Sequence, residues 1–167
     1  MGVMAGDLRR GASDSTSVCC ATGSTVCVDV ISPDHQEFDS MTERTIKVPG
    51  ADHPISVEPA RARVVVTVAG RVIADTEKAL VLREASYPAV YYIPRNDADM
   101  NLLARTDHTT YCPYKGECAY YSITPGGERA VNAVWTYESP YAAVKEIAQH
   151  LAFYPDRVDS IDVQALS

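Results

Sequence analysis

The residue types that could carry out chemistry gather around one short turn near residue 112. Cys112 is a candidate thiolate nucleophile, and the nearby cation Lys115 could favour its thiolate form. His108 is the nearest candidate base, although four residues of extended chain place it about 13 Å away. The alternative is that Cys112 is a small buried hydrophobic residue. Glu138 is either a general base or an acid that precedes a helix.

Basic and aromatic side chains on both sides of this turn suggest a binding pocket. Arg83, Arg95 and Lys115 could hold an anionic group. Trp135 and Tyr137 are two residues apart on a predicted strand, so they point to the same face and could stack on a flat ring. The alternative is that these aromatic side chains are ordinary core residues, since the ten tyrosines also suit a β-sheet.

Two metal-binding hypotheses are weaker. His108, Cys112 and Cys118 are zinc ligand types, but the sequence has no Cys-x-x-Cys and no evident fourth ligand. Asp97 and Asp99 form an Asp-x-Asp pair, which could hold magnesium for nucleotidyl transfer. The same carboxylates stand where a helix would need its cap and first-turn acids, and capping is the better account. We therefore predict no metal site.

The elements that must position these residues are mostly strands. Alternating and β-branched runs predict strands at 55–58, 63–68, 71–75, 79–85, 90–93, 109–112, 118–123, 130–137 and 158–163. Ala69-Gly70 and Lys115-Gly116 predict the turns of two hairpins. A short helical segment is predicted at 100–105. A C-terminal helix is predicted from Ser139 to Leu151, because a Ser-Pro start precedes apolar residues at helical spacing. This pattern indicates a mainly β or α+β fold with antiparallel strands.

Composition limits the classes of function. The 167 residues fit one domain, and a net charge of −7 argues against a nucleic-acid or anionic-membrane binder. Five cysteines in no framework and no secretory signal favour a cytoplasmic protein. Residues 1–40 are polar and predict a disordered extension, explained either by a start codon assigned too far upstream or by a regulatory or targeting tail. Residues 41–167 are predicted to form a single domain.

The segment 63–159 resembles the bacterial and fungal DUF427 family, a domain of unknown function that is sometimes labelled a nucleotidyltransferase domain. Four motifs carry the resemblance: Ala69-Gly-Arg-Val-Ile-Ala-Asp75, Leu82-Arg-Glu84, Tyr92-Ile-Pro-Arg95 and Thr109-Thr-Tyr-Cys-Pro-Tyr-Lys-Gly116. The resemblance implies an antiparallel β barrel or tent-like roll with short helices. It also implies a site at the polar and aromatic positions that recur in the family: Arg83, Glu84, Tyr92, Arg95, Cys112, Lys115, Tyr121, Trp135 and Tyr137.

Together these observations predict a protein that binds a small planar anionic ligand such as a nucleotide. Arg83, Arg95 and Lys115 would hold the anion. The ring would lie against Tyr121, Trp135 and Tyr137, with Glu84 and Tyr92 completing the ligand-binding set. Cys112, Lys115 or Glu138 would carry any catalysis, and no cofactor is specified. The alternatives are a protein-interaction module without an active site, and a nucleotidyltransferase as the family label suggests.

Overall fold

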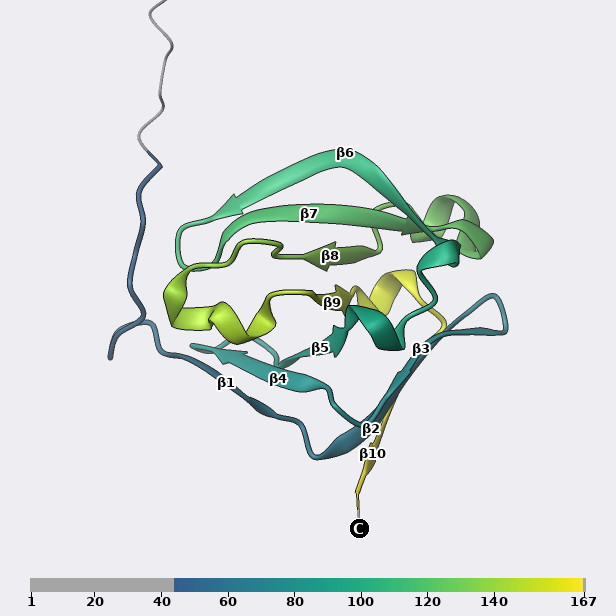
Figure 1. Cartoon of the computed structure of the whole chain (residues 1–167), viewed down its shortest axis with the longest axis horizontal. Helices are drawn as coiled ribbons and strands as arrows, with labels where there is room; N and C mark the ends of the chain where they lie inside the picture. Colours follow the sequence, from purple (N-terminus) through teal and green to yellow (C-terminus); the bar gives the residue numbers. More distant parts are fainter. Residues whose placement is uncertain (1–43, 167) are drawn as a thin grey trace, which may run out of the picture. The chain divides into compact units, whose positions relative to one another are not determined.

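A computed structural model describes residues 44–166, and the predicted extension 1–40 lies outside them. The described chain is mainly β, with two antiparallel sheets and short 3-10 helices (Figure 1). The larger sheet has the strand order β1-β4-β5-β9-β8-β7-β6, and the smaller has the order β10-β2-β3. The strands are β1 (Ile55–Pro59), β2 (Ala62–Val68), β3 (Arg71–Thr76), β4 (Leu80–Glu84), β5 (Val90–Pro94), β6 (Leu103–Cys112), β7 (Gly116–Ile123), β8 (Val134–Thr136), β9 (His150–Phe153) and β10 (Ser160–Ala165).

Five 3-10 helices connect the strands. They are η1 (Arg95–Asp97), η2 (Met100–Leu102), η3 (Thr124–Ala130), η4 (Ala142–Ile147) and η5 (Pro155–Arg157). None of the helices in the described chain is both long enough and apolar enough to cross a membrane.

The β2–β3 hairpin forms as its sequence predicts. Ala69 and Gly70 both have positive φ, 50° and 69°, which is the backbone of a two-residue turn that matches the twist of the flanking strands. Along β2 the side chains of Val64, Val66 and Val68 are buried, while the intervening residues are more exposed. This alternation makes one face of the small sheet apolar.

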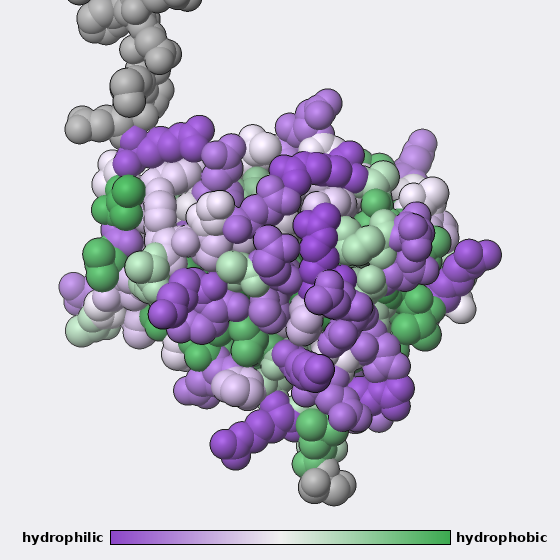
Figure 2. All heavy atoms as spheres, in the orientation of Figure 1, coloured by the Kyte–Doolittle hydropathy of each residue, from purple (hydrophilic) through white to green (hydrophobic). Residues whose placement is uncertain are grey.

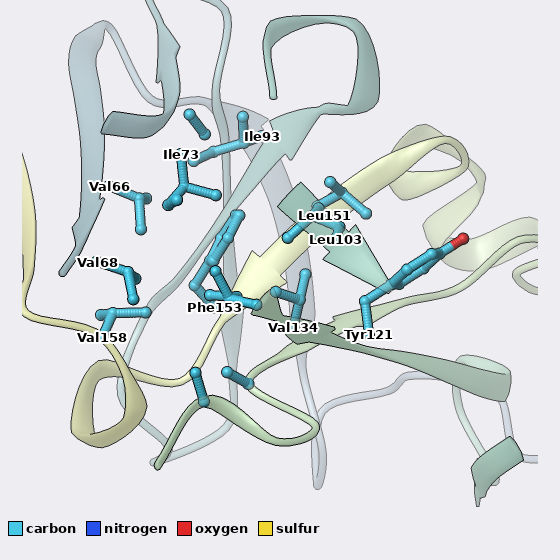
Figure 3. Packing of buried hydrophobic residues seen from close by; sticks show 14 of the residues in the cluster. Val66, Val68, Ile73, Ile93, Leu103, Tyr121, Val134, Leu151, Phe153 and Val158 are labelled. Atoms are coloured by element: carbon cyan, nitrogen blue, oxygen red, sulfur yellow. The ribbon is translucent and has the colours of Figure 1, made fainter. Parts of the chain in front are cut away.

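The main core lies between the two sheets (Figure 3). Val66 and Val68 of the small sheet lie on one side, and Val134, Leu151 and Phe153 of the large sheet lie on the other. The burial of these branched and aromatic side chains is the main favourable term that holds the two sheets together.

A second buried cluster lies on the opposite face of the large sheet. Neighbouring residues of one strand belong to different clusters: Ile93 joins the main core and Tyr92 the second cluster. Val144 and Ile147 of η4 cover the second cluster. Because side chains alternate across a strand, this face also receives Glu84, Trp135 and Tyr137.

The predicted C-terminal helix is wrong. Residues 142–147 form the 3-10 helix η4, which is interrupted at Val144 (φ −136°), and residues 150–153 form strand β9 in the middle of the large sheet. A single isolated helix of this length is marginal in water. Pairing of Leu151 with Ile93 and of Phe153 with Val134 supplies backbone hydrogen bonds and core burial that the helix would lack.

Of the predicted barrel or tent-like roll, a closed barrel is not confirmed, because the large sheet of the described chain ends in two edge strands, β1 and β6. The helical segment expected at 100–105 is limited to η2 and continues directly into β6. The strand expected at 130–137 is shortened to β8. On the face drawn in Figure 2, hydrophobic residues form separate patches among hydrophilic ones.

Candidate functional site

Lys115 is a buried cation. It is only 7% exposed, and it lies in the tight connection between β6 and β7, where its N–H donates to the carbonyl oxygen of Cys112 (3.3 Å). Gly116 follows with φ +102°, and a Cβ atom there would lie 3.4 Å from the carbonyl oxygen of Ser139. Only glycine adopts this conformation without strain, so the Lys-Gly pair turns the chain and directs the lysine into the domain.

The Lys115 ammonium donates a hydrogen bond to Glu84 Oε2, which forms a salt bridge between β4 and the β6–β7 turn. The other carboxylate oxygen, Glu84 Oε1, lies 2.9 Å from Nε2 of His53. The His53 ring stacks on Tyr114, with centroids 4.1 Å apart and planes at 8°. Both Glu84 oxygens therefore have partners, and three segments far apart in sequence meet at one carboxylate.

Two opposing effects act on Glu84. Burial would raise the pKa of its carboxyl, but the hydrogen bonds from His53 and Lys115 and the charge of Lys115 outweigh this and lower the pKa below its ordinary value of 4.5. The carboxylate is therefore charged at neutral pH, which suits its role as the counter-charge of Lys115.

Lys115 and Glu84 line a cavity of about 220 Å³, which we call the Lys115 cavity. Tyrosine hydroxyls surround it, and burial raises the pKa of Tyr92, Tyr120 and Tyr137 well above the ordinary value of 10, so these phenols stay protonated. The complete lining is Leu82, Glu84, Val90, Tyr92, Lys115, Cys118, Tyr120, Trp135, Tyr137 and Tyr154.

Trp135 provides the flat wall of this cavity. Its Nε1–H donates to the Tyr92 hydroxyl (3.3 Å), and its ring packs on Tyr154 with centroids 4.4 Å apart. The Tyr92 ring meets it edge-on, with centroids 6.5 Å apart. These contacts fix the indole in one orientation.

The Lys115 cavity offers several unused hydrogen-bond donors. Each Glu84 oxygen already accepts one hydrogen bond. Lys115 has three N–H groups, of which Glu84 uses one, and the others have no protein partner within residues 44–166. The Tyr92 oxygen accepts from Trp135, which leaves its O–H to donate. Such a donor-rich cavity is complementary to a ligand group that accepts hydrogen bonds, above all an oxyanion.

The thiols of Cys112 and Cys118, near this cavity, have different environments. Burial raises the pKa of the Cys118 thiol above its ordinary value, against hydrogen bonds that lower it, so Cys118 stays neutral. Cys112 is half-buried beside the same cluster, while the neighbouring Lys115 ammonium is engaged by Glu84. His108 packs on the ring of Tyr120, with centroids 4.5 Å apart.

The remaining sequence-predicted residues lie elsewhere. Arg95, Tyr121 and Glu138 form a separate cluster with Arg105, whose Nη1 donates to Glu138 Oε1 (2.5 Å). The Arg95 and Arg105 guanidinium groups lie 5.4 and 6.0 Å from the centroid of the Tyr121 ring. This ring belongs to the main core and points its hydroxyl away from the aliphatic side chains (Figure 3). The cluster covers the core on the face opposite the Lys115 cavity.

Arg83 also lies away from the cavity. Its side chain is 58% exposed, and its nearest carboxylate is Glu58, 3.7 Å away. Arg83 and Glu84 are neighbours on β4 and so point to opposite faces of the sheet. The three predicted cations, Arg83, Arg95 and Lys115, therefore do not converge on one group.

The two acidic residues considered for magnesium have local structural partners. Asp99 caps η2 by accepting from the backbone N–H of Asn101 (3.1 Å), as the capping hypothesis predicts. Asp97 instead accepts from the Thr76 hydroxyl (2.6 Å). No group of three or more His, Cys, Asp or Glu side chains that could hold a metal ion is found between residues 44 and 166.

His53 and Tyr154 are among the residues of the site that were missed from the sequence. His53 precedes the first strand, and only the pairing of β1 with β4 brings it to Glu84. Tyr154 follows β9, which the sequence pattern assigned to the C-terminal helix. Trp135 and Tyr137 are two residues apart in the chain, and this spacing predicted that their side chains lie on the same face. Both line the cavity in the structure.

Comparison with family models gives a match. The family model described as a domain of unknown function, DUF427, and labelled NTP_transf_9, matches residues 56–164. This range includes every residue of the Lys115 cavity and leaves out His53. No curated protein matches the chain.

Proposed function

The chain belongs to the DUF427 family, and we propose that it binds a small planar anionic ligand in the Lys115 cavity. The observation that carries this proposal is the buried Lys115 ammonium, which keeps unused hydrogen-bond donors at a cavity that tyrosines also line, while each Glu84 oxygen already accepts one hydrogen bond. The anionic group of the ligand would accept from Lys115 and Tyr92. The ring of the ligand would lie against Trp135.

The proposal assigns different roles to the predicted residues. Lys115 binds the anion, and Glu84 and His53 position Lys115. Trp135, Tyr92 and Tyr137 shape the cavity. Arg83, Arg95, Tyr121 and Glu138 lie outside the cavity and have no part in binding this ligand.

A thermal-shift screen of the whole chain tests this function. The probes are nucleotides, coenzymes and aromatic carboxylates, each with and without magnesium. A ligand present at one hundred times its Kd adds about 2.7 kcal/mol to the free energy of unfolding, which raises the Tm by several degrees. We expect planar anions to do this and their neutral analogues not to.

Two variants make the screen specific. The double variant Glu84→Gln/Lys115→Met removes both members of the ion pair together, which avoids leaving a buried charge without a partner. We expect it to fold and to lose the anion-dependent shift, while Arg83→Ala keeps it. A magnesium-dependent nucleotide shift that is lost in Asp97→Asn/Asp99→Asn would instead support the nucleotidyltransferase label. No shift with any compound would favour the interaction module.

A further inference from the structure

Strands β5 and β9 pair with each other over a very short length. They pair only through Ile93 with Leu151 and Pro94 with His150, after which the strands separate. A second cavity of about 430 Å³ lies at this separation, and we call it the β5–β9 cavity. Consecutive residues Val90 and Tyr91 both line it, although neighbours on a strand point to opposite faces. The cavity therefore passes through the plane of the large sheet.

The lining of the β5–β9 cavity is almost entirely apolar. Val66 and Ile161 of the small sheet contribute to its wall, and Ile93 and Phe153 come from the two separated strands. Glu84 is the one charged residue that contributes, and its carboxylate oxygens are bonded to His53 and Lys115. The complete lining is Val66, Glu84, Tyr87, Pro88, Ala89, Val90, Tyr91, Ile93, Trp135, Phe153, Pro155 and Ile161.

The two cavities share a wall. Glu84, Val90 and Trp135 line both of them, so the donor-rich Lys115 cavity adjoins the apolar β5–β9 cavity at the indole of Trp135. A volume of about 430 Å³ falls within the range of small-molecule sites, which bind an apolar body and use a few polar groups to orient it.

We infer that the ligand is an amphipathic monocarboxylic acid, with its carboxylate at Lys115 and an alkyl or aryl body in the β5–β9 cavity. This inference rests on the proposed function, from which it keeps the anion at Lys115, and it replaces the planar ring by an apolar body that need not be planar. Lys115 is a single cation already paired with Glu84, so a head with one negative charge suits it better than a phosphate dianion. The polar edges of a base and ribose would lose their hydrogen bonds to water against an apolar lining, which disfavours a nucleotide.

A series of straight-chain carboxylates, from acetate to decanoate, tests this inference by calorimetric titration of the whole chain. Each methylene that enters the apolar cavity strengthens binding by about fourfold. We expect the Kd to fall by about this factor per carbon over part of the series and then to level off when the cavity is full. Matched alcohols, which lack the charged head, are expected to bind much more weakly.

The variant Ala89→Phe tests the β5–β9 cavity independently of the Lys115 cavity. Ala89 is exposed and lines only the β5–β9 cavity, so a larger side chain there obstructs this cavity without contact with Lys115. We expect it to weaken binding of the long acids and to spare the short ones. Ala143→Phe, at an exposed position that lines neither cavity, is the matched control.

The outcomes distinguish this inference from the proposed function. If anions bind at Lys115 with no dependence on chain length, the inference fails and the proposed function stands. If acids and alcohols bind equally well, or if binding survives in Glu84→Gln/Lys115→Met, the proposed role of Lys115 fails as well. If no member of the series and no planar anion binds, both are wrong.

Discussion

At the scale of single residues, the site depends on one ion pair that is mostly removed from water. Lys115 and Glu84 have side chains that are 9% and 17% exposed, and His53 completes the coordination of the carboxylate. Breaking such a pair by removing one partner costs about 3–5 kcal/mol, because a charge is left buried without compensation. Removal of either partner alone therefore destabilises the domain, whereas removal of both together leaves no buried charge without a partner.

The ion pair makes stability depend on pH. The pKa of Glu84 in the folded protein lies below its ordinary value of 4.5, so the unfolded state binds the proton more readily. The contribution of Glu84 to the free energy of unfolding is fully present above the ordinary pKa of 4.5. It is lost as the pH falls through the lower pKa that Glu84 has in the folded protein. We expect the difference in free energy of unfolding between the native protein and Glu84→Gln to shrink between about pH 5 and pH 3. Urea unfolding at each pH measures this, and a constant difference would contradict it.

The contacts of the residues around Cys112 indicate its role. A nucleophilic thiol needs a base or a free cation beside it. The nearest cation, Lys115, is bound to Glu84, and His108 packs on Tyr120. These contacts favour the alternative that Cys112 is a packing residue at the edge of the second cluster.

At the scale of elements, the β6–β7 hairpin is the element that presents Lys115. Its turn depends on Gly116, which has φ +102° and lies close to the carbonyl oxygen of Ser139. The N–H of Tyr141 also donates to the carbonyl oxygen of Lys115 (3.1 Å), which ties the turn to the segment before η4. The position of the lysine is therefore set by backbone geometry rather than by side-chain packing alone.

Gly116→Ala tests this dependence. A side chain at this backbone conformation costs about 1–2 kcal/mol, and the close contact with Ser139 adds to it. We expect a lower Tm and weaker ligand binding together, because the turn that directs Lys115 is strained. Gly50→Ala is the control, since a Cβ there meets no atom within 4 Å and the glycine has no positive φ. Equal Tm values for the two variants would show that the turn adapts.

At the scale of the whole molecule, the two faces of the large sheet have different roles. One face packs against the small sheet and forms the main core, and the other carries the second cluster and the Lys115 cavity. The β5–β9 cavity lies where these two regions meet. The main core and the Lys115 cavity therefore lie on opposite sides of the same strands.

The pair Val64→Ala and Val65→Ala tests which face of the small sheet packs into the main core. Val64 is fully buried in the main core, and Val65 is its half-buried neighbour on the outer face of β2. Loss of two methyl groups from the core costs about 2 kcal/mol, including the space left behind, and the outer position costs less than half of this. Urea unfolding measures both. Similar losses at the two positions would contradict the assignment of the inner and outer faces.

The sequence alone predicted the local elements of this protein. The β-branched run at 63–68, the Ala69-Gly70 turn and the Lys115-Gly116 turn all indicated hairpins that the structure contains. The family resemblance is confirmed over residues 56–164. These features depend on the period of side chains along a strand and on turn conformations, which neighbouring residues determine by themselves.

Only the tertiary structure decided which residues share a site. Glu84 and Lys115 are 31 residues apart in the chain, and their contact follows from the curvature and strand order of the large sheet. Alternation along β4 turns Arg83 away from Glu84 and Lys115, and Arg95 lies in the separate cluster with Glu138. Pairing of β9 with β5 and β8 draws residues 150–153 into a strand despite their helical pattern. Pairing between distant strands gains hydrogen bonds and burial that no local pattern encodes, so it overrides the weak local preference for a helix.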